Sequence, residues 1–148
     1  MVNAVVDTNV LVAGVLTSNP RSSSRGLLDR HRHGDFTLLL SPAALNEIQE
    51  VLALPHVRAM HGLSDDEIGL FCLGLEFASN TRVLSGMLPV SPAVTRDVTD
   101  TKWVALALEA GADYLVTKDH RHLHRLRNIG KTRIVTPHKF LQALEDPA

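Results

Sequence analysis

The chain has 148 residues, a length that fits one domain with enough interior for a hydrophobic core. Its residues are 45% hydrophobic and 21% charged with no biased tract, which excludes a disordered or fibrous protein. The formal net charge is -1, so no global excess of positive charge marks a nucleic-acid-binding protein. We predict a single globular domain over residues 1–148.

Neither the first residues nor any later segment is typical of a targeting or membrane signal. The N-terminal stretch lacks a positively charged part, and Asp7 and Asn9 interrupt its apolar residues. No segment approaches the roughly 18 apolar residues of a membrane span. We therefore expect a cytoplasmic protein that makes no membrane contact.

Short apolar runs alternate with longer amphipathic stretches along the chain. This pattern predicts an α/β fold, a doubly wound and mostly parallel sheet of about five strands with helices on both faces. The predicted strands are residues 4–6, 36–40, 81–84, 114–116 and 133–135. Several are continuous apolar runs, as buried strands should be.

Four helices are predicted from residues suited to an N-cap, proline at a first helical position and one capping box. They run from Ser41 to about Leu54, from Ser64 to about Ala78, from Thr99 or Asp100 to Gly111, and from Thr136 onward. The lone cysteine, Cys72, falls in the second of them at helical spacing from other apolar residues, which predicts a buried, inert thiol. A single cysteine also excludes an intramolecular disulfide and a cysteine-based zinc site.

Two aspartates follow predicted strands directly. Asp7 comes after residues 4–6, and Asp119 comes shortly after residues 114–116. In an open parallel sheet, ligands bind beyond the carboxyl ends of the strands, where the strand order reverses. Both aspartates are therefore expected at the same edge of the sheet.

Two further acids are placed by the predicted helices. On a helical wheel, Glu47 lies at the margin of the apolar stripe beside Val51 and can point into a cleft, whereas Glu50 faces water. Asp100 stands at the start of its helix, at the expected edge. Asp97 is an additional candidate, as a ligand or as a loop-stabilising residue.

Each acid also has an ordinary structural explanation. Asp100 can cap its helix, Asp7 and Asp119 can stabilise turns at strand ends, and Glu47 can be a surface acid. Four carboxylates at one edge, however, would repel one another unless a cation were bound or their pKa values were strongly raised. Oxygen ligands favour Mg²⁺ or Mn²⁺ over zinc, and such ions promote phosphodiester cleavage.

At these residues the sequence resembles the PIN-domain nucleases, in particular the bacterial toxin components of toxin-antitoxin pairs (VapC-like). The matching segments, in order, are residues 5–12, 40–47, 96–107, 111–119 and 134–141. Each is short, but their ordered combination spans nearly the whole chain.

The resemblance implies a Rossmann-like three-layer α/β/α sandwich and an endoribonuclease that depends on one or two Mg²⁺ or Mn²⁺ ions. It implies a metal site and catalytic site made of Asp7, Glu47, Asp100 and Asp119. Supporting hydrogen bonds are expected from Thr8, Asn9 and Thr117. The expected partners are an RNA substrate, a second copy of the chain in a homodimer, and a small antitoxin protein.

Two other functions are compatible with parts of the pattern. A phosphatase of the haloacid-dehalogenase type also has an aspartate after its first strand, but it needs a second one where this chain has Asn9. A regulatory domain that binds RNA without cleaving it could keep the same fold. Metal-dependent cleavage that Asp7→Asn abolishes would separate an enzyme from a binding domain.

Basic and histidine-rich runs could contact RNA phosphates or be ordinary polar surfaces. One is His31-Arg32-His33, and the other covers residues 120–127, with Arg121, Arg125 and Arg127 as candidate RNA-binding residues. In a helix, His120 and His124 would share a face and could bind a transition metal, although no third ligand is evident.

Overall fold

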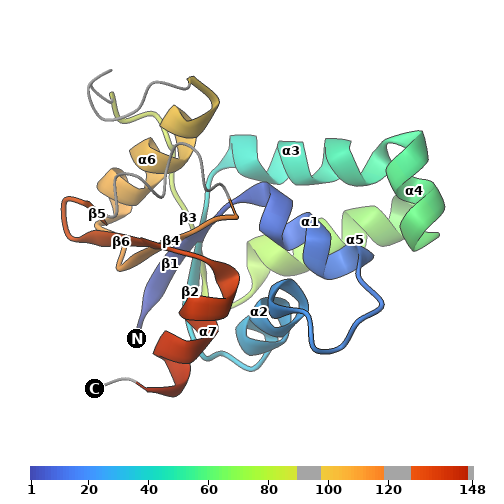
Figure 1. The fold of residues 1–148 in the computed structure, drawn as a ribbon. Helices are drawn as coiled ribbons and strands as arrows, with labels where there is room; N and C mark the ends of the chain where they lie inside the picture. The colour runs from blue at the N-terminus through green and yellow to red at the C-terminus, as the bar shows by residue number, and fades with distance from the viewer. Residues whose placement is uncertain (90–97, 119–127, 147–148) are drawn as a thin grey trace.

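The computed structural model describes residues 1–89, 98–118 and 128–146, except for the side chains of residues 98–101 and 128. A sheet with the strand order β3-β2-β1-β4-β6-β5 forms its centre (Figure 1). Five strands are parallel, and β5 alone runs antiparallel to its neighbour β6. The strands are β1 (Asn3–Val6), β2 (Thr37–Leu40), β3 (Thr81–Val83), β4 (Tyr114–Val116), β5 (Asn128–Ile129) and β6 (Thr132–Val135).

Helices cover both faces of this sheet. The described helices are α1 (Thr8–Leu16), α2 (Ser23–Arg32), α3 (Pro42–Ala53), α4 (Pro55–His61), α5 (Asp65–Phe77), α6 (Val98–Ala110) and α7 (Pro137–Glu145). Helix α6 packs against β1, β2, β4 and β5, and Figure 1 shows it across the sheet from α1–α5. Helix α7 packs against α2 and β4. The predicted α/β fold is confirmed as a three-layer α/β/α arrangement.

The core lies where apolar strands meet the helices. Val5, Leu39 and Leu115 in the three central strands are fully buried, as strands covered on both faces should be. The rings of Phe36, next to β2, and Phe140 of α7 make an edge-to-face contact, with their centroids 5.0 Å apart. Among the described residues, none of the helices has the length and apolarity that crossing a lipid bilayer would take.

The predicted elements agree with the structure in most places. All five predicted strands occur, each within one residue at either end. Ser41 caps α3, Thr136 caps α7, and Ser64 caps α5 in a complete capping box with Glu67. Cys72 is buried, and burial raises the pKa of its thiol, as expected for an inert cysteine.

Other expectations were wrong. Helix α6 begins at Val98, so Thr99 and Asp100 lie inside its first turn and do not cap it. Three helices, α1, α2 and α4, were not predicted. Pro55 was expected only to stop α3, but it also occupies the first position of α4, where its missing N–H costs nothing.

The run His31-Arg32-His33 does not form a continuous basic surface. The His31 side chain is 5% exposed, and its Nε2 lies 3.0 Å from Oγ1 of Thr81 in β3. Burial lowers the pKa of His31, which favours the neutral ring. Only Arg32 and His33 of this run are exposed. The second run, residues 120–127, lies outside the described residues.

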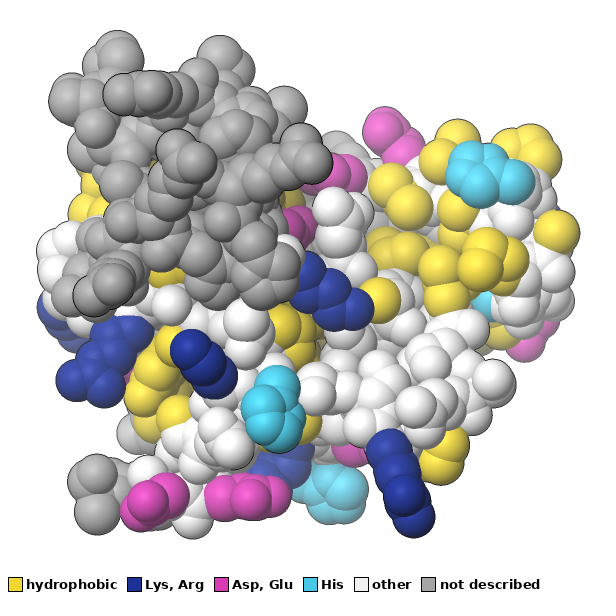
Figure 2. All heavy atoms as spheres, viewed as in Figure 1, with side chains coloured by type: hydrophobic (Ala, Val, Ile, Leu, Met, Phe, Trp, Pro, Cys, Tyr) yellow, Lys and Arg dark blue, Asp and Glu magenta, His cyan; other side chains and the backbone are white. Residues whose placement is uncertain are grey.

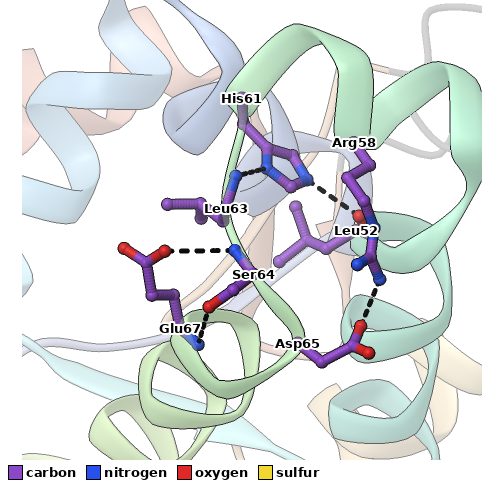
Figure 3. A network of polar contacts seen from close by, with 7 residues as sticks. All are labelled: Leu52, Arg58, His61, Leu63, Ser64, Asp65 and Glu67. Atoms are coloured by element: carbon purple, nitrogen blue, oxygen red, sulfur yellow. Dashed lines mark hydrogen bonds and ion pairs between the residues drawn. The ribbon is translucent and has the colours of Figure 1, made fainter.

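A network of polar contacts joins the end of α3 to the start of α5 (Figure 3). The backbone N–H of Leu63 donates to Nδ1 of His61 at 2.8 Å, so the proton of a neutral His61 ring must be on Nε2. That Nε2 lies 2.8 Å from the carbonyl oxygen of Leu52 and donates to it. An ion pair between Arg58 and Asp65 completes the connection. Helix α4 is thus held between its two neighbours.

Hydrophobic side chains gather at the right of Figure 2, over the end of α3 and over α4. Leu54, which follows α3, and Met60 of α4 are exposed, at 42% and 65%. This apolar surface is therefore carried by the C-terminal end of α3 and by α4, away from the N-cap at Ser41.

Candidate functional site

The strand order reverses between β1 and β4. From β1 the chain proceeds outward through β2 and β3, and from β4 it proceeds to β6 on the other side. A crevice beyond the carboxyl ends of the two central strands is the usual ligand site of such sheets. Asp7 follows β1 and Thr117 follows β4, and the backbone N–H of Asp7 donates to the carbonyl of Val116 at 2.9 Å.

The Asp7 carboxylate is held from two sides. Its Oδ1 accepts a hydrogen bond from the backbone N–H of Asn9 at 3.1 Å, which makes Asp7 the N-cap of α1. Its Oδ2 accepts one from Oγ1 of Thr117 at 3.0 Å. Thr117 is fully buried and Asp7 is 8% exposed. Capping therefore explains one carboxylate oxygen, whereas the other is positioned by the neighbouring strand.

Burial raises the pKa of Asp7 above its ordinary value. The hydrogen bonds from Asn9 and Thr117 favour the charged form and offset part of this effect, while the nearby charge of Glu47 raises the pKa further and that of Lys102 lowers it. An aspartate that served only as a cap would gain nothing from burial beside a second carboxylate. A pKa perturbed by burial and by a specific charged partner is typical of functional sites.

Glu47 approaches this carboxylate from α3. The helix buries Ala44, Leu45, Ile48 and Leu52. Glu47 is half-buried at the margin of this face and Glu50 is exposed, as the helical wheel predicts. Helix α3 packs against α1, the helix that Asp7 caps. Two acids from segments far apart in the sequence therefore share one site.

Sequence reasoning missed Lys102. Its Nζ forms an ion pair with Oε2 of Glu47 and lies 4.8 Å from the ring centroid of Trp103. No sequence signal could have found it, because the ion pair spans 55 positions.

The expected supporting residues have different environments. The Asn9 side chain is exposed, and its contribution to Asp7 is the backbone N–H. Thr8 is 1% exposed, and its buried Oγ1 has no hydrogen-bond partner among the residues that the structure describes. Thr117 donates a hydrogen bond to Asp7 directly.

Of the remaining predicted site residues, Asp100 alone lies within the described part of the chain. The backbone of Asp100 lies in the first turn of α6, two residues before Lys102, and its side chain is not described. Asp97, Asp119, Arg121, Arg125 and Arg127 lie outside the described residues, as do His120 and His124. Within residues 1–89, 98–118 and 128–146, no group of three or more potential metal ligands occurs.

The described part of the site suits a hard cation. Its acidic ligands are carboxylate oxygens, which Mg²⁺ and Mn²⁺ prefer. A positive charge, the Lys102 ammonium, already lies against one of them. The charges of Asp7 and Glu47 disfavour each other, and a divalent ion bound by both would relieve this repulsion.

Comparison with known protein families agrees with this geometry. The sequence model of a family described as PIN domain matches residues 3–121, from the start of β1 past Thr117. No curated protein matches the chain. PIN domains are generally nucleases that hydrolyse phosphodiester bonds, and they typically bind divalent metals such as Mg²⁺. Because the match covers more than half of its residues, the chain belongs to the PIN domain family.

Proposed function

We propose that the protein is an endoribonuclease that depends on Mg²⁺ or Mn²⁺ and hydrolyses RNA through four carboxylates, Asp7, Glu47, Asp100 and Asp119. The observation that carries the proposal is the environment of Asp7. Its carboxylate is buried where the strand order reverses, and it accepts hydrogen bonds from Asn9 and Thr117. It also lies near enough to Glu47 for the negative charge of Glu47 to raise the pKa of Asp7. Family membership supports phosphodiester hydrolysis as the reaction class.

Asp7, Asp100 and Asp119, with Glu47 as a fourth ligand, are proposed to hold one or two ions. Asp7 is already oriented by two hydrogen bonds, so little reorganisation is needed for it to act as a ligand. Asp100 belongs to the same helix as Lys102, which contacts Glu47. Asp119 follows Thr117, the residue that binds Asp7, by two positions. These placements support all three as candidates.

Glu47 is proposed to orient the attacking water and to accept its proton on a carboxylate oxygen. The side chain is 34% exposed, so water can reach it. A divalent cation, when bound, supplies the Lewis acidity that activates the water and offsets charge on the phosphodiester. Attack by water, and not by the ribose 2′-hydroxyl, leaves 5′-phosphate and 3′-hydroxyl ends.

The test is cleavage of labelled single-stranded RNA by the purified protein with Mg²⁺, with Mn²⁺ and with a chelator. We expect cleavage with either ion, none with the chelator, and at least about 100-fold less with Asp7→Asn. Products with 2′,3′-cyclic phosphate would contradict hydrolysis by water. An intact protein that binds RNA but cleaves none with either ion would favour the RNA-binding alternative.

We also propose, from the resemblance, that the protein is the toxin of a toxin-antitoxin pair and forms a homodimer. Expression with and without the neighbouring upstream reading frame tests the toxin role. Growth arrest that the neighbour relieves is the expected result, and sequencing of the cleaved RNA ends would then identify the substrate. Unimpaired growth of cells that contain the active nuclease would contradict it.

A further inference from the structure

Lys102 is the one positive charge that the described structure places against the two acids of the site. Its Nζ pairs with Oε2 of Glu47, and the two side chains are 39% and 34% exposed. The same ammonium is close enough to Asp7 to favour the charged form of that carboxylate. It therefore interacts with both described acids, one of which follows β1 while the other lies in α3.

The ammonium group is fixed by its surroundings. The face of the Trp103 ring lies 4.8 Å from Nζ, and Trp103 is itself 5% exposed in the core. A cation over an aromatic face gains favourable electrostatic energy. The ion pair with Glu47 and the contact with the Trp103 ring therefore both hold the charge at the site.

The charges of the described groups indicate how Lys102 affects metal binding. Asp7 and Glu47 each carry one negative charge when ionised, and Lys102 offsets one of them. A divalent cation that uses Glu47 must approach a carboxylate whose Oε2 already contacts an ammonium. Like charges at such short range repel, so the two cations compete for Glu47.

On the basis of the proposed function, we infer that Lys102 is a positioning residue that holds Glu47 in the metal-free protein and competes with the divalent cation for its carboxylate. Lys102 thereby sets the metal affinity of the site. In this arrangement the ammonium holds the Glu47 carboxylate until a cation of higher charge displaces it.

Calorimetric titration of the native protein with Mn²⁺ and with Mg²⁺ measures this effect without recourse to catalysis. Removal of the competing charge in Lys102→Met should tighten metal binding about tenfold, the order expected for one charge near a partly exposed site. Lys102→Arg, which keeps the charge, should stay within about threefold of the native affinity. Thermal melts of each variant verify that it is folded.

Lys131→Met is the matched control. Nζ of Lys131 lies 3.9 Å from Oδ1 of Asp113. Asp113 precedes β4 and Lys131 precedes the parallel strand β6, so both lie at the opposite edge of the sheet from Asp7, which follows β1. Its removal changes the net charge equally and should leave metal affinity unchanged. An equal gain in Lys102→Met and Lys131→Met would overturn the inference, because a general charge effect would then explain both.

A double-mutant cycle with Glu47→Gln tests whether competition passes through that carboxylate. In the Glu47→Gln background, Lys102→Met should tighten binding by less than about threefold, since the Glu47 carboxylate for which the two cations compete is absent. Weaker or unchanged binding in Lys102→Met, beside a native protein that binds metal, overturns the inference and leaves the proposed function standing. A native protein that binds neither ion overturns both.

Discussion

Oγ1 of Thr117 donates a hydrogen bond of 3.0 Å to Oδ2 of Asp7, joining the ends of β4 and β1 where the strand order reverses. The two residues are 110 positions apart in the sequence, and both are buried. A hydrogen bond to the charged form of a carboxylate lowers its pKa. Thr117 therefore counteracts the burial that raises the pKa of Asp7.

Thr117→Val should move the acid limb of the pH–activity profile to higher pH. The change keeps the shape of the side chain and removes the hydroxyl, so the pKa of Asp7 rises further and more of it is protonated at a given pH. The activity at low pH should fall more than the activity at high pH. The profile of cleavage rate against pH measures the effect.

Thr132→Val is the control for this change. Thr132 is equally buried, and its Oγ1 donates to the carbonyl of Ala112 at 2.6 Å, away from Asp7. Both variants should lose stability because each leaves a buried acceptor with one bond fewer. Only Thr117→Val should shift the profile, and identical profiles for the two variants would contradict the positioning role.

Asp7→Asn should raise the melting temperature of the metal-free protein at neutral pH by a few degrees. The folded-state pKa of Asp7 is raised above the unfolded value, so the stability that its protonated form contributes is present at low pH and is lost as pH rises through the folded pKa. Asparagine is neutral throughout and keeps this contribution. Melting curves at neutral and at acidic pH measure the difference.

The gain should shrink as the pH falls, because native Asp7 then becomes protonated and resembles the neutral amide. Added Mn²⁺ should raise the melting temperature of the native protein, as any ligand of the folded state does, and should do so much less for Asp7→Asn. A variant that is less stable than the native protein at neutral pH would show that the charged carboxylate stabilises the fold, because asparagine caps a helix as well as aspartate does, and it would contradict a raised pKa of Asp7.

Glu47→Gln should lower the cleavage rate constant by about 100-fold to 10,000-fold, the range of a lost general base. Glutamine keeps the size of the side chain but cannot accept a proton at neutral pH. Glu50→Gln is the matched control, because Glu50 lies on the same helix and is exposed. Single-turnover cleavage rates of both variants provide the measurement, and similar losses in the two would contradict a specific role for Glu47.

Much of the fold follows from local sequence signals. Continuous apolar runs mark β1, β2 and β4 because strands buried on both faces need no alternation. Helix α1 was not predicted because its residues are mostly apolar with little helical periodicity, and five of its nine residues are buried. The two-residue β5 is too short to carry any pattern.

Only part of the candidate site could be predicted from the sequence. Asp7 could be found because it directly follows a strand, and Glu47 because its place on the helical wheel differs from that of Glu50. The partners of these acids, Thr117 for Asp7 and Lys102 for Glu47, come from distant segments. For Thr117 the family resemblance supplied the expectation. For Lys102 no spacing rule applies, since its ion pair joins α6 to α3 across 55 positions.

Gly14→Ala should destabilise the protein by about 1–3 kcal/mol, the usual cost of forcing extra volume into a packed interior. A Cβ at this position in α1 would lie 2.7 Å from the backbone oxygen of Ser24 and 2.7 Å from Cδ1 of Leu28, both in α2. The backbone oxygen cannot rotate away as a side chain can, so α1 and α2 must separate. Chemical denaturation measures the loss.

Gly74→Ala provides the opposite expectation within the same chain. Gly74 is exposed in α5, and a Cβ there would meet no atom within 4 Å. Alanine should therefore stabilise the protein by about 0.5–1 kcal/mol, because glycine loses more backbone freedom than alanine when a helix forms. Stabilisation of both variants would contradict the close contact of α1 with α2 at Gly14.

Because Asp7 caps α1, Gly14→Ala should also reduce the metal-dependent rise in melting temperature, which Gly74→Ala should leave unchanged.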